Sequence, residues 1–193
     1  LWVSLKNGEI YTYNQTTDHF ILKVKLTDYF SNTATLNAIY FDKLNRLWFC
    51  LSNGLFLYDI ETDKVLEIPG FSDMNITQII QSGDHTFYVG AGQHIFFFTD
   101  NQHHTQFSLP EKNQTETGVI ESLHIVNNYL YIGTFSNSAF VLNMNTGNIH
   151  SLKNDIPSVP IRSIVSTNDH EEVWLGTDGN GIYVLNAHTH QLE

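Results

Sequence analysis

The stretch that decides the fold is VWLGTDGNGIYVLN, residues 173–186. Two short apolar runs, Val173 to Leu175 and Ile182 to Leu185, flank a turn of sequence Thr-Asp-Gly-Asn-Gly. Apolar runs on either side of Asp-Gly or Asn-Gly are typical of a β-hairpin, because these residues adopt positive φ at low cost. The stretch therefore predicts two antiparallel strands joined by a tight turn.

Weaker copies of this hairpin recur upstream, with a spacing of about 43 residues. They begin at residues 1, 47, 87 and 130 and read LWVSLKNGEIYTYN, LWFCLSNGLFLYD, FYVGAGQHIFFFTD and LYIGTFSNSAFVLN. A period near forty is typical of β-propeller blades and of some helical repeats. The content of each period decides between these two classes.

Each complete period contains four short apolar runs separated by polar turns. In the first, the runs are 36–41, 47–51, 55–60 and 65–68. They are rich in β-branched and aromatic residues, and no helical spacing of apolar residues is found, so helical repeats are excluded. Some runs are apolar at consecutive positions, as at Ile95 to Phe98, which predicts strands covered on both faces. Stacked propeller blades cover strands in this way.

We therefore predict an all-β fold, a β-propeller segment of four-stranded antiparallel blades that is part of a larger propeller of the seven-blade type. We expect one propeller segment over 1–193, cut from a longer array. Its predicted parts are a partial blade at 1–34, blades at 35–74, 75–117 and 118–159, and a nearly complete blade at 160–193.

A small residue stands two positions after the leading aromatic of every hairpin. These residues are Ser4, Cys50, Gly90, Gly133 and Gly176. The pattern predicts a close approach from an adjacent blade at this position. Cys50 is then the small residue of its repeat rather than a reactive thiol. As the single cysteine of the chain, it also excludes an internal disulfide.

The charge of the chain argues against one class of partner. Nine Lys and Arg residues stand against twenty Asp and Glu residues, giving a formal net charge of -11. Such a surface repels phosphate backbones, so no nucleic acid is expected to bind. No run approaches the ~18 consecutive apolar residues of a membrane span. Contact with a membrane is expected only through other parts of a parent chain.

The hairpin at 173–186, preceded by Ile161 to Ile164 and the turn at 168–172, resembles the two-component-regulator propeller repeat. The copy at 47–59, with Asp42 ahead of it, fits this pattern almost as well. The copies at 87 and 130 depart from it, since Tyr replaces Trp and the turn glycine is replaced by His94 or Ser138. The repeat is found in the extracytoplasmic sensor regions of hybrid histidine kinases from polysaccharide-degrading bacteria.

The resemblance implies a periplasmic sensor region of an inner-membrane protein, which responds to a glycan and signals to a kinase. The kinase and DNA-binding parts of such proteins lie elsewhere in the polypeptide. The segment itself is then not an enzyme. A ligand is expected at the face where the second-to-third-strand turns and the interblade loops converge, because amides beside an aromatic ring suit sugar hydroxyls and pyranose faces. The candidate ligand-binding residues there are Asn53, Phe71, His94, Asn137, Asp178 and Asn180.

No catalytic residue, metal ligand or cofactor is predicted. The acidic residues fall mainly in turns, where they are ordinary turn formers or solvated charges. The His103-His104 and His188/His190 groups lack further ligands at metal-binding spacing, and we interpret them as solvated turns.

Two other functions remain open at this point. A propeller-fold glycoside hydrolase or polysaccharide lyase would need a convergent pair of carboxylates or a Tyr-His pair in the axial pocket. A protein-interaction propeller would need a wide exposed apolar patch. Pairing of exposed strand edges would also allow a homodimer.

Overall fold

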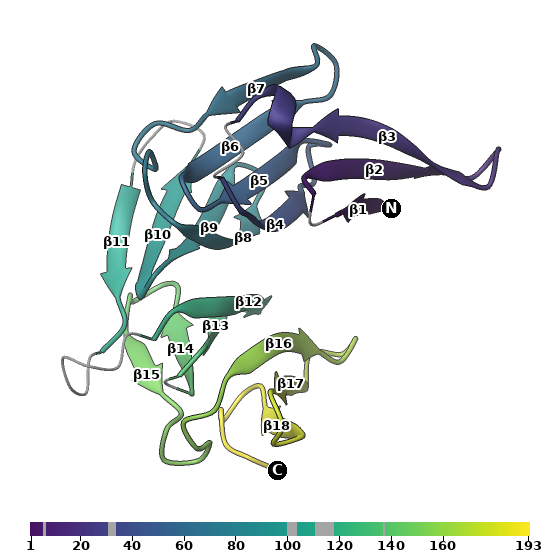
Figure 1. Cartoon of the computed structure of the whole chain (residues 1–193). Coiled ribbons are helices and arrows are strands. Elements are labelled where there is room, and N and C mark those ends of the chain that lie inside the picture. The colour runs from purple at the N-terminus through teal and green to yellow at the C-terminus, as the bar shows by residue number, and fades with distance from the viewer. Residues whose placement is uncertain (6, 31–33, 100–103, 111–117, 137) are drawn as a thin grey trace. The chain divides into compact units, whose positions relative to one another are not determined.

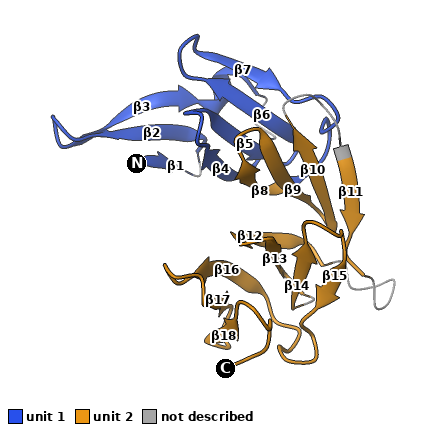
Figure 2. Ribbon diagram, turned by 180° about the vertical axis from the view of Figure 1, so that it is seen from behind, with its two compact units in different colours: residues 1–76 blue, residues 77–193 orange. Residues whose placement is uncertain are grey.

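The structure is a computed structural model that describes residues 1–5, 7–30, 34–99, 104–110, 118–136 and 138–193. Two compact units are formed, Leu1–Ile76 (unit 1) and Thr77–Glu193 (unit 2), which Figure 2 colours separately. Each unit is described by itself. Among the described residues, no helix is long and apolar enough to cross a membrane.

Unit 1 contains two antiparallel sheets (Figure 1). The first has the order β1-β2-β3, with β1 at Trp2–Ser4, β2 at Glu9–Asn14 and β3 at His19–Lys25. The short 3-10 helix η1, Leu26–Asp28, follows it. The second sheet has the order β4-β5-β6-β7, with strands Leu36–Phe41, Leu47–Leu51, Gly54–Asp59 and Lys64–Glu67. Ile10 and Val24 of the first sheet pack with Phe49 and Tyr58 of the second.

Unit 2 contains three antiparallel sheets. The first comprises β8 (Ile76–Gly83, which starts at the last residue of unit 1), β9 (Thr86–Ala91), β10 (His94–Thr99) and β11 (His104–Ser108). The second comprises β12 (Ile120–Val126), β13 (Tyr129–Thr134), β14 (Ala139–Asn143) and β15 (Ile149–Ser151). The third comprises β16 (Ile161–Ser166), β17 (Glu172–Thr177) and β18 (Ile182–Asn186), with an isolated bridge from Leu185 to Leu192.

The predicted fold class is confirmed. Consecutive strands pair with their neighbours in each of the five sheets, which have three or four strands. In unit 2, one apolar core lies between each pair of adjacent sheets. Leu130 and Phe140 pack toward Tyr88 and Ile95 on one side of the β12–β15 sheet, whereas Tyr131 and Val141 pack toward the β16–β18 sheet on the other side. Both faces of the central sheet are therefore covered, as the consecutive apolar residues predict.

The small residues of the repeat lie where an adjacent sheet approaches closely. A Cβ atom added to Gly90 would lie 2.8 Å from Cγ2 of Ile120, the first residue of the next sheet. A Cβ atom on Gly133 would lie 2.8 Å from the carbonyl oxygen of Ile161, which is again the first residue of the next sheet. The expected close approach is thus confirmed in unit 2. Its source is the inner strand of the following blade.

The turn before β5 shows how one hairpin is fixed. Asp42 is 3% exposed. Its Oδ1 accepts hydrogen bonds from the backbone N–H groups of Leu44 and Arg46. Its Oδ2 accepts hydrogen bonds from Nε of Arg46 at 2.7 Å and from Nε1 of Trp48 at 2.9 Å. Burial alone would raise the pKa of Asp42, but the hydrogen bonds from Trp48 and Arg46 outweigh it and lower that pKa below its usual value. Asp42 is therefore a turn former, as predicted from its position.

Candidate ligand-binding site

Two inner strands of unit 2 carry a β-bulge near their first residue. The register of β12 against β13 shifts between Ile120 and Ser122, and that of β16 against β17 shifts between Ile161 and Ser163. The extra residues are Glu121 and Arg162. A bulge leaves one residue outside the regular alternation of the strand and changes the direction of its side chain. Equivalent bulges in adjacent sheets therefore place two charged side chains at the same end of unit 2.

Glu121 and Arg162 form the centre of a charged cluster. Nη1 of Arg162 lies 2.7 Å from both carboxylate oxygens of Glu121. Nη2 of Arg162 donates to Oδ2 of Asp178 at 2.8 Å, and Nε reaches the same oxygen at 3.3 Å. The hydrogen bond with Asp178 and the charge of Glu121 raise the pKa of Arg162. The cluster therefore contains a permanent cation held between carboxylates from two sheets.

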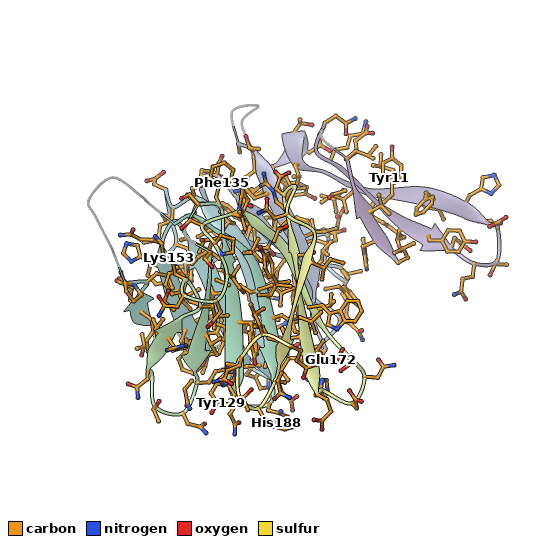
Figure 3. The ribbon with its side chains drawn as sticks, turned by 90° about the horizontal axis from the view of Figure 1, so that it is seen from below. Tyr11, Tyr129, Phe135, Lys153, Glu172 and His188 are labelled. Atoms are coloured by element: carbon orange, nitrogen blue, oxygen red, sulfur yellow. The ribbon has the colours of Figure 1, made fainter. Side chains whose placement is uncertain are left out.

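Phe135 supplies an aromatic surface beside this cluster. Its ring centroid is 5.3 Å from Cζ of Arg162, within the range of a cation–π interaction. The residue follows β13 directly, its backbone N–H donates to the carbonyl oxygen of Val119 at 2.8 Å, and it is 48% exposed. Figure 3 shows Phe135 at one end of the strands of unit 2 and Tyr129 and His188 at the other end. We call Glu121, Phe135, Arg162 and Asp178 the Arg162 cluster.

The turn between β17 and β18 holds Asp178 and Asn180 at the surface. Oγ1 of Thr177 donates to the carbonyl oxygen of Gly181 at 2.7 Å and accepts the N–H of Asn180 at 3.0 Å. Gly181 adopts φ +76°, and no atom lies within 4 Å of an added Cβ, so the turn requires glycine for its backbone conformation. Asp178 and Asn180 are both exposed on this short, hydrogen-bonded turn.

His94 and Asn53, two of the other predicted site residues, have contacts of their own. Nδ1 of His94 lies 3.0 Å from Oγ of Ser108 and 2.9 Å from Nε2 of Gln106, so His94 contacts the outer strand β11. Asn53 belongs to unit 1, where its carbonyl oxygen accepts the N–H of Asp73 at 3.0 Å. Its side-chain Oδ1 is buried and has no hydrogen-bond partner among the described residues. Asn137 lies outside the described residues.

The prediction that Phe71 offers an aromatic platform is wrong. Phe71 is 0% exposed, so its ring is not available at the surface. Phe135 has the exposed ring instead. Sequence reasoning also missed Glu121 and Arg162. The signal that would have found them is the repeated Ile-x-Ser at the start of the inner strands, Ile120 to Ser122 and Ile161 to Ser163.

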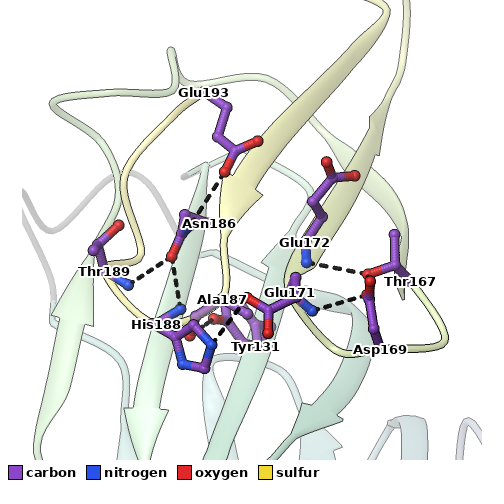
Figure 4. Close-up of polar contacts among 10 residues, drawn as sticks. All are labelled: Tyr131, Thr167, Asp169, Glu171, Glu172, Asn186, Ala187, His188, Thr189 and Glu193. Atoms are coloured by element: carbon purple, nitrogen blue, oxygen red, sulfur yellow. Dashed lines mark hydrogen bonds and ion pairs between the residues drawn. The ribbon is translucent and has the colours of Figure 1, made fainter.

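The opposite end of unit 2 contains histidines with structural roles. Oδ1 of Asn186 accepts the N–H groups of His188 and Thr189, and the His188 ring lies 3.1 Å from the Glu171 carboxylate (Figure 4). The Tyr131 hydroxyl lies 2.7 Å from Nδ1 of His190 and 3.3 Å from the carbonyl oxygen of Ala187. The solvated-turn interpretation suits the exposed His188. It is wrong for His190, which is partly buried and packs against aromatic rings.

No group of three His, Cys, Asp or Glu side chains suited to a metal ion is found within the described part of the chain. Unit 1 has a pocket of about 320 Å³ that contains none of the predicted residues. It is lined by Leu44, Asn45, Arg46, Leu57, Tyr58, Asp59, Ile60, Glu61 and Leu66.

Solved structures of low sequence identity share the fold. The extracellular domain of the hybrid two-component system BT4673 from B. thetaiotaomicron matches with a TM-score of 0.78 at 15% identity, over 100% of this chain and 27% of that chain. The extracellular domain of the hybrid two-component system BT3049 from the same organism matches with a TM-score of 0.76 at 20% identity, over 100% of this chain and 26% of that chain. This chain is a β-propeller segment.

Virginiamycin B lyase from Staphylococcus aureus has the same fold, with a TM-score of 0.79 at 15% identity over 100% of this chain and 64% of the lyase chain. The segment thus spans about a quarter of the two sensor domains and less than two thirds of the lyase. No family model and no curated protein matches the sequence. At these identities the likeness shows the fold, which hosts more than one function.

Proposed function

We propose that this chain is a ligand-binding segment in the periplasmic sensor region of a two-component signalling protein of the hybrid histidine kinase type, and that its ligand is an oligosaccharide. The observation that carries the proposal is the Arg162 cluster, which places planar polar groups beside a half-exposed aromatic ring. The shared fold with two extracellular domains of hybrid two-component systems supports it. The repeat resemblance of residues 173–186 supports it as well.

The chemistry of the Arg162 cluster suits sugar hydroxyls. Ionised carboxylates accept hydrogen bonds only, and each oxygen has two lone pairs. Oδ2 of Asp178 faces Arg162, which leaves Oδ1 for a hydroxyl donor. The amide of Asn180 on the same turn can donate and accept. The apolar face of a pyranose ring fits an aromatic surface such as Phe135.

Charge favours a neutral sugar over an acidic one. Both carboxylates of the cluster are engaged by the same guanidinium, so the cluster keeps a net negative charge. Arg162 already bonds two carboxylates, whose negative charges oppose the approach of a third anion. The whole chain has a formal net charge of -11, which also repels sulfated and uronate sugars. The proposed ligand is therefore a neutral oligosaccharide.

The position of the cluster gives the ligand a route to signalling. Glu121 and Phe135 belong to the β12–β15 sheet, whereas Arg162 and Asp178 belong to the β16–β18 sheet. A ligand that touches both sheets binds best to one arrangement of the two, and it shifts the population toward that arrangement. The kinase that reads this change would lie in the parent protein.

Catalysis is not part of the proposal. General acid–base hydrolysis by two carboxyl groups needs one of them to donate a proton to the leaving group. Glu121 and Asp178 both accept hydrogen bonds from Arg162 instead. This arrangement suits binding better than proton transfer.

Titration calorimetry of the chain against a panel of oligosaccharides tests the proposal. We expect heat from one or more neutral oligosaccharides and none from oligogalacturonate or chondroitin fragments. Arg162→Ala and Phe135→Ala should each weaken the binding tenfold or more, which corresponds to about 1.4 kcal/mol. Lys23→Ala, which removes an exposed cation in unit 1, should leave the affinity unchanged. Binding that survives Arg162→Ala unchanged would overturn the assignment of the site.

A further inference from the structure

Asn-Gly pairs occur at three places in the chain, and the fold holds them differently. They are Asn7-Gly8, Asn53-Gly54 and Asn180-Gly181. In such a pair the backbone nitrogen of the glycine can attack the side-chain amide of the asparagine, because glycine has no Cβ to crowd the five-membered ring that forms. The reaction needs an asparagine side chain that can turn, a glycine N–H outside any hydrogen bond, and access for water.

The pair at residues 7–8 is held by hydrogen bonds. Oδ1 of Asn7 accepts a hydrogen bond from the backbone N–H of Glu9 at 3.1 Å. The N–H of Gly8 donates to the carbonyl oxygen of Leu5 at 3.0 Å. Both bonds must break before the Gly8 nitrogen can reach the amide carbon of Asn7, and breaking them costs free energy. The fold therefore protects this pair.

The pair at residues 53–54 is held by burial. Oδ1 of Asn53 is buried, and Gly54 is buried as the first residue of β6, where it pairs with Leu51. A Cβ atom added to Gly54 would lie 3.0 Å from the ring of Phe56, so the backbone has little room to move. The fold therefore restricts both the ring closure and the access of water at this pair.

The pair at residues 180–181 is held by neither. Among the described residues, the side chain of Asn180 has no hydrogen-bond partner, and its backbone N–H donates to Oγ1 of Thr177 at 3.0 Å. The N–H of Gly181 also has no partner among these residues, since the bonds of the turn go to its carbonyl oxygen. No atom lies within 4 Å of a Cβ added to Gly181, and Asn180 is exposed. This pair meets every requirement of the reaction.

The accessibility of this turn follows from its place at the end of two strands. The equivalent turn residues 92–93 and 135–136 of unit 2 are partly or fully exposed, although the next sheet packs on each of their sheets. A further sheet packed on β16–β18 would therefore leave residues 180–181 accessible in the same way.

The adjacent Asp178-Gly179 pair is less reactive than Asn180-Gly181. The same ring closure on an aspartate needs a protonated carboxyl group, because an ionised oxygen is a poor leaving group. Asp178 forms an ion pair with Arg162 at 2.8 Å, and an Asp carboxyl is ionised at neutral pH. The reactive position of the turn is therefore Asn180.

We propose that Asn180 is a site of spontaneous deamidation in the folded chain. The Gly181 nitrogen forms a bond to Cγ of Asn180, the bond from Cγ to Nδ2 breaks, and ammonia leaves with the proton of the Gly181 N–H. Water then opens the resulting succinimide at either carbonyl group, which yields aspartate or isoaspartate. One water molecule is taken up for each ammonia released, and no oxidant, reductant or cofactor is required.

Deamidation changes the chemistry of the turn. The amide of Asn180 donates and accepts hydrogen bonds, whereas the carboxylate that replaces it only accepts them. The new negative charge stands on the same turn as Asp178, and isoaspartate also adds an extra carbon atom to the backbone. A resulting loss of oligosaccharide affinity rests on the proposed function, whereas the modification itself does not.

Peptide mapping by mass spectrometry tests the modification without any ligand. The intact chain is incubated in mildly alkaline buffer made with 18O-labelled water and then digested in ordinary water, so the label marks only conversion that precedes digestion. Asn180 should convert at least tenfold faster than Asn7 and Asn53, which corresponds to about 1.4 kcal/mol in the barrier. Equal rates at the three pairs of the folded chain, or an Asn180 that stays unconverted, would overturn the proposal.

The chain in urea is the control for the role of the fold. The three pairs should convert there at similar rates, because the hydrogen bonds of Asn7 and the burial of Asn53 are lost. An Asn180 that is equally favoured in urea would contradict the explanation by the fold. Asn180→Gln is the matched variant, since glutamine closes a less favourable six-membered ring, and it should abolish the label at residue 180.

Discussion

Oγ of Ser122 donates a hydrogen bond to the carbonyl oxygen of Ile161 at 3.0 Å, and it joins the inner strands of two adjacent sheets of unit 2. The bond is buried and lies directly over Gly133. An added Cβ on this glycine would be 2.2 Å from the Ser122 hydroxyl and 2.8 Å from the Ile161 oxygen. Gly133 is therefore a contact point between two adjacent sheets of unit 2.

Gly133→Ala should destabilise unit 2. The added methyl group must displace the backbone of Ile161 or break its bond with Ser122, and overpacking of this kind costs about 1–3 kcal/mol. Gly83→Ala is the control, because its added Cβ would come no closer than 3.6 Å to any neighbour. Urea denaturation measures both free energies of unfolding. Equal stabilities for the two variants would show that the blades do not meet at Gly133.

Trp48→Phe should cost about 1–3 kcal/mol, because it leaves a buried carboxylate oxygen of Asp42 without one of its donors. Trp174→Phe is a matched substitution, since its Nε1 donates to Glu172 in an exposed hydrogen bond of 2.7 Å. Its effect should stay within about 0.5 kcal/mol. The difference in unfolding free energy between the two variants is the measurement. A larger loss for Trp174→Phe would contradict this account of the Asp42 turn.

The stability of unit 2 should fall as the pH drops from 7.5 to 5.5. Burial, followed by the nearby His150 and His188, lowers the pKa of His190. The unfolded chain then binds the proton more tightly, so the stability of the neutral ring is complete above about pH 6.5 and is lost as the pH falls toward the folded pKa. His190→Gln removes this titration and should reduce the fall in Tm. His19→Gln in unit 1 should leave it unchanged.

Cys50 should be inert in the folded chain. It is fully buried, and burial raises the pKa of its thiol, so almost no thiolate forms at neutral pH. A thiol reagent such as iodoacetamide should modify it in 6 M urea but not in buffer, as read by mass spectrometry. Rapid modification of the native chain would contradict the structural role predicted for it.

The sequence predicted the elements that recur. The hairpin of Trp174 and Gly176 has four relatives at a spacing of about 43 residues, and repetition makes a short apolar pattern reliable. It also predicted the tight turn that exposes Asp178 and Asn180, because Gly179 and Gly181 adopt positive φ there. These features depend on local backbone chemistry, which a sequence records directly.

The rest of the site depends on relations between sheets. A bulge is a change of register between two paired strands. The alternation of apolar and polar residues along one strand does not reveal it. The sequence therefore showed Arg162 only as part of the run Ile161 to Ile164. In the structure, its Nη1 lies 2.7 Å from the carboxylate of Glu121 in the preceding sheet. Phe71 and Phe135 both follow strands in the sequence, and only the packing around them decides which ring is buried. The same holds for His190, whose partner Tyr131 is 59 residues away in the chain.

The measurement that tests the proposed function most directly is a heteronuclear NMR titration of the labelled chain with the neutral oligosaccharide that gives the strongest calorimetric signal. The account predicts that the amide signals of Glu121, Phe135, Arg162 and residues 177–181 shift together and saturably. The signals around His188 and Glu171, at the other end of the same strands, should not move. Shifts confined to that other end, or no shifts with any neutral oligosaccharide, would contradict a sugar site at the Arg162 cluster.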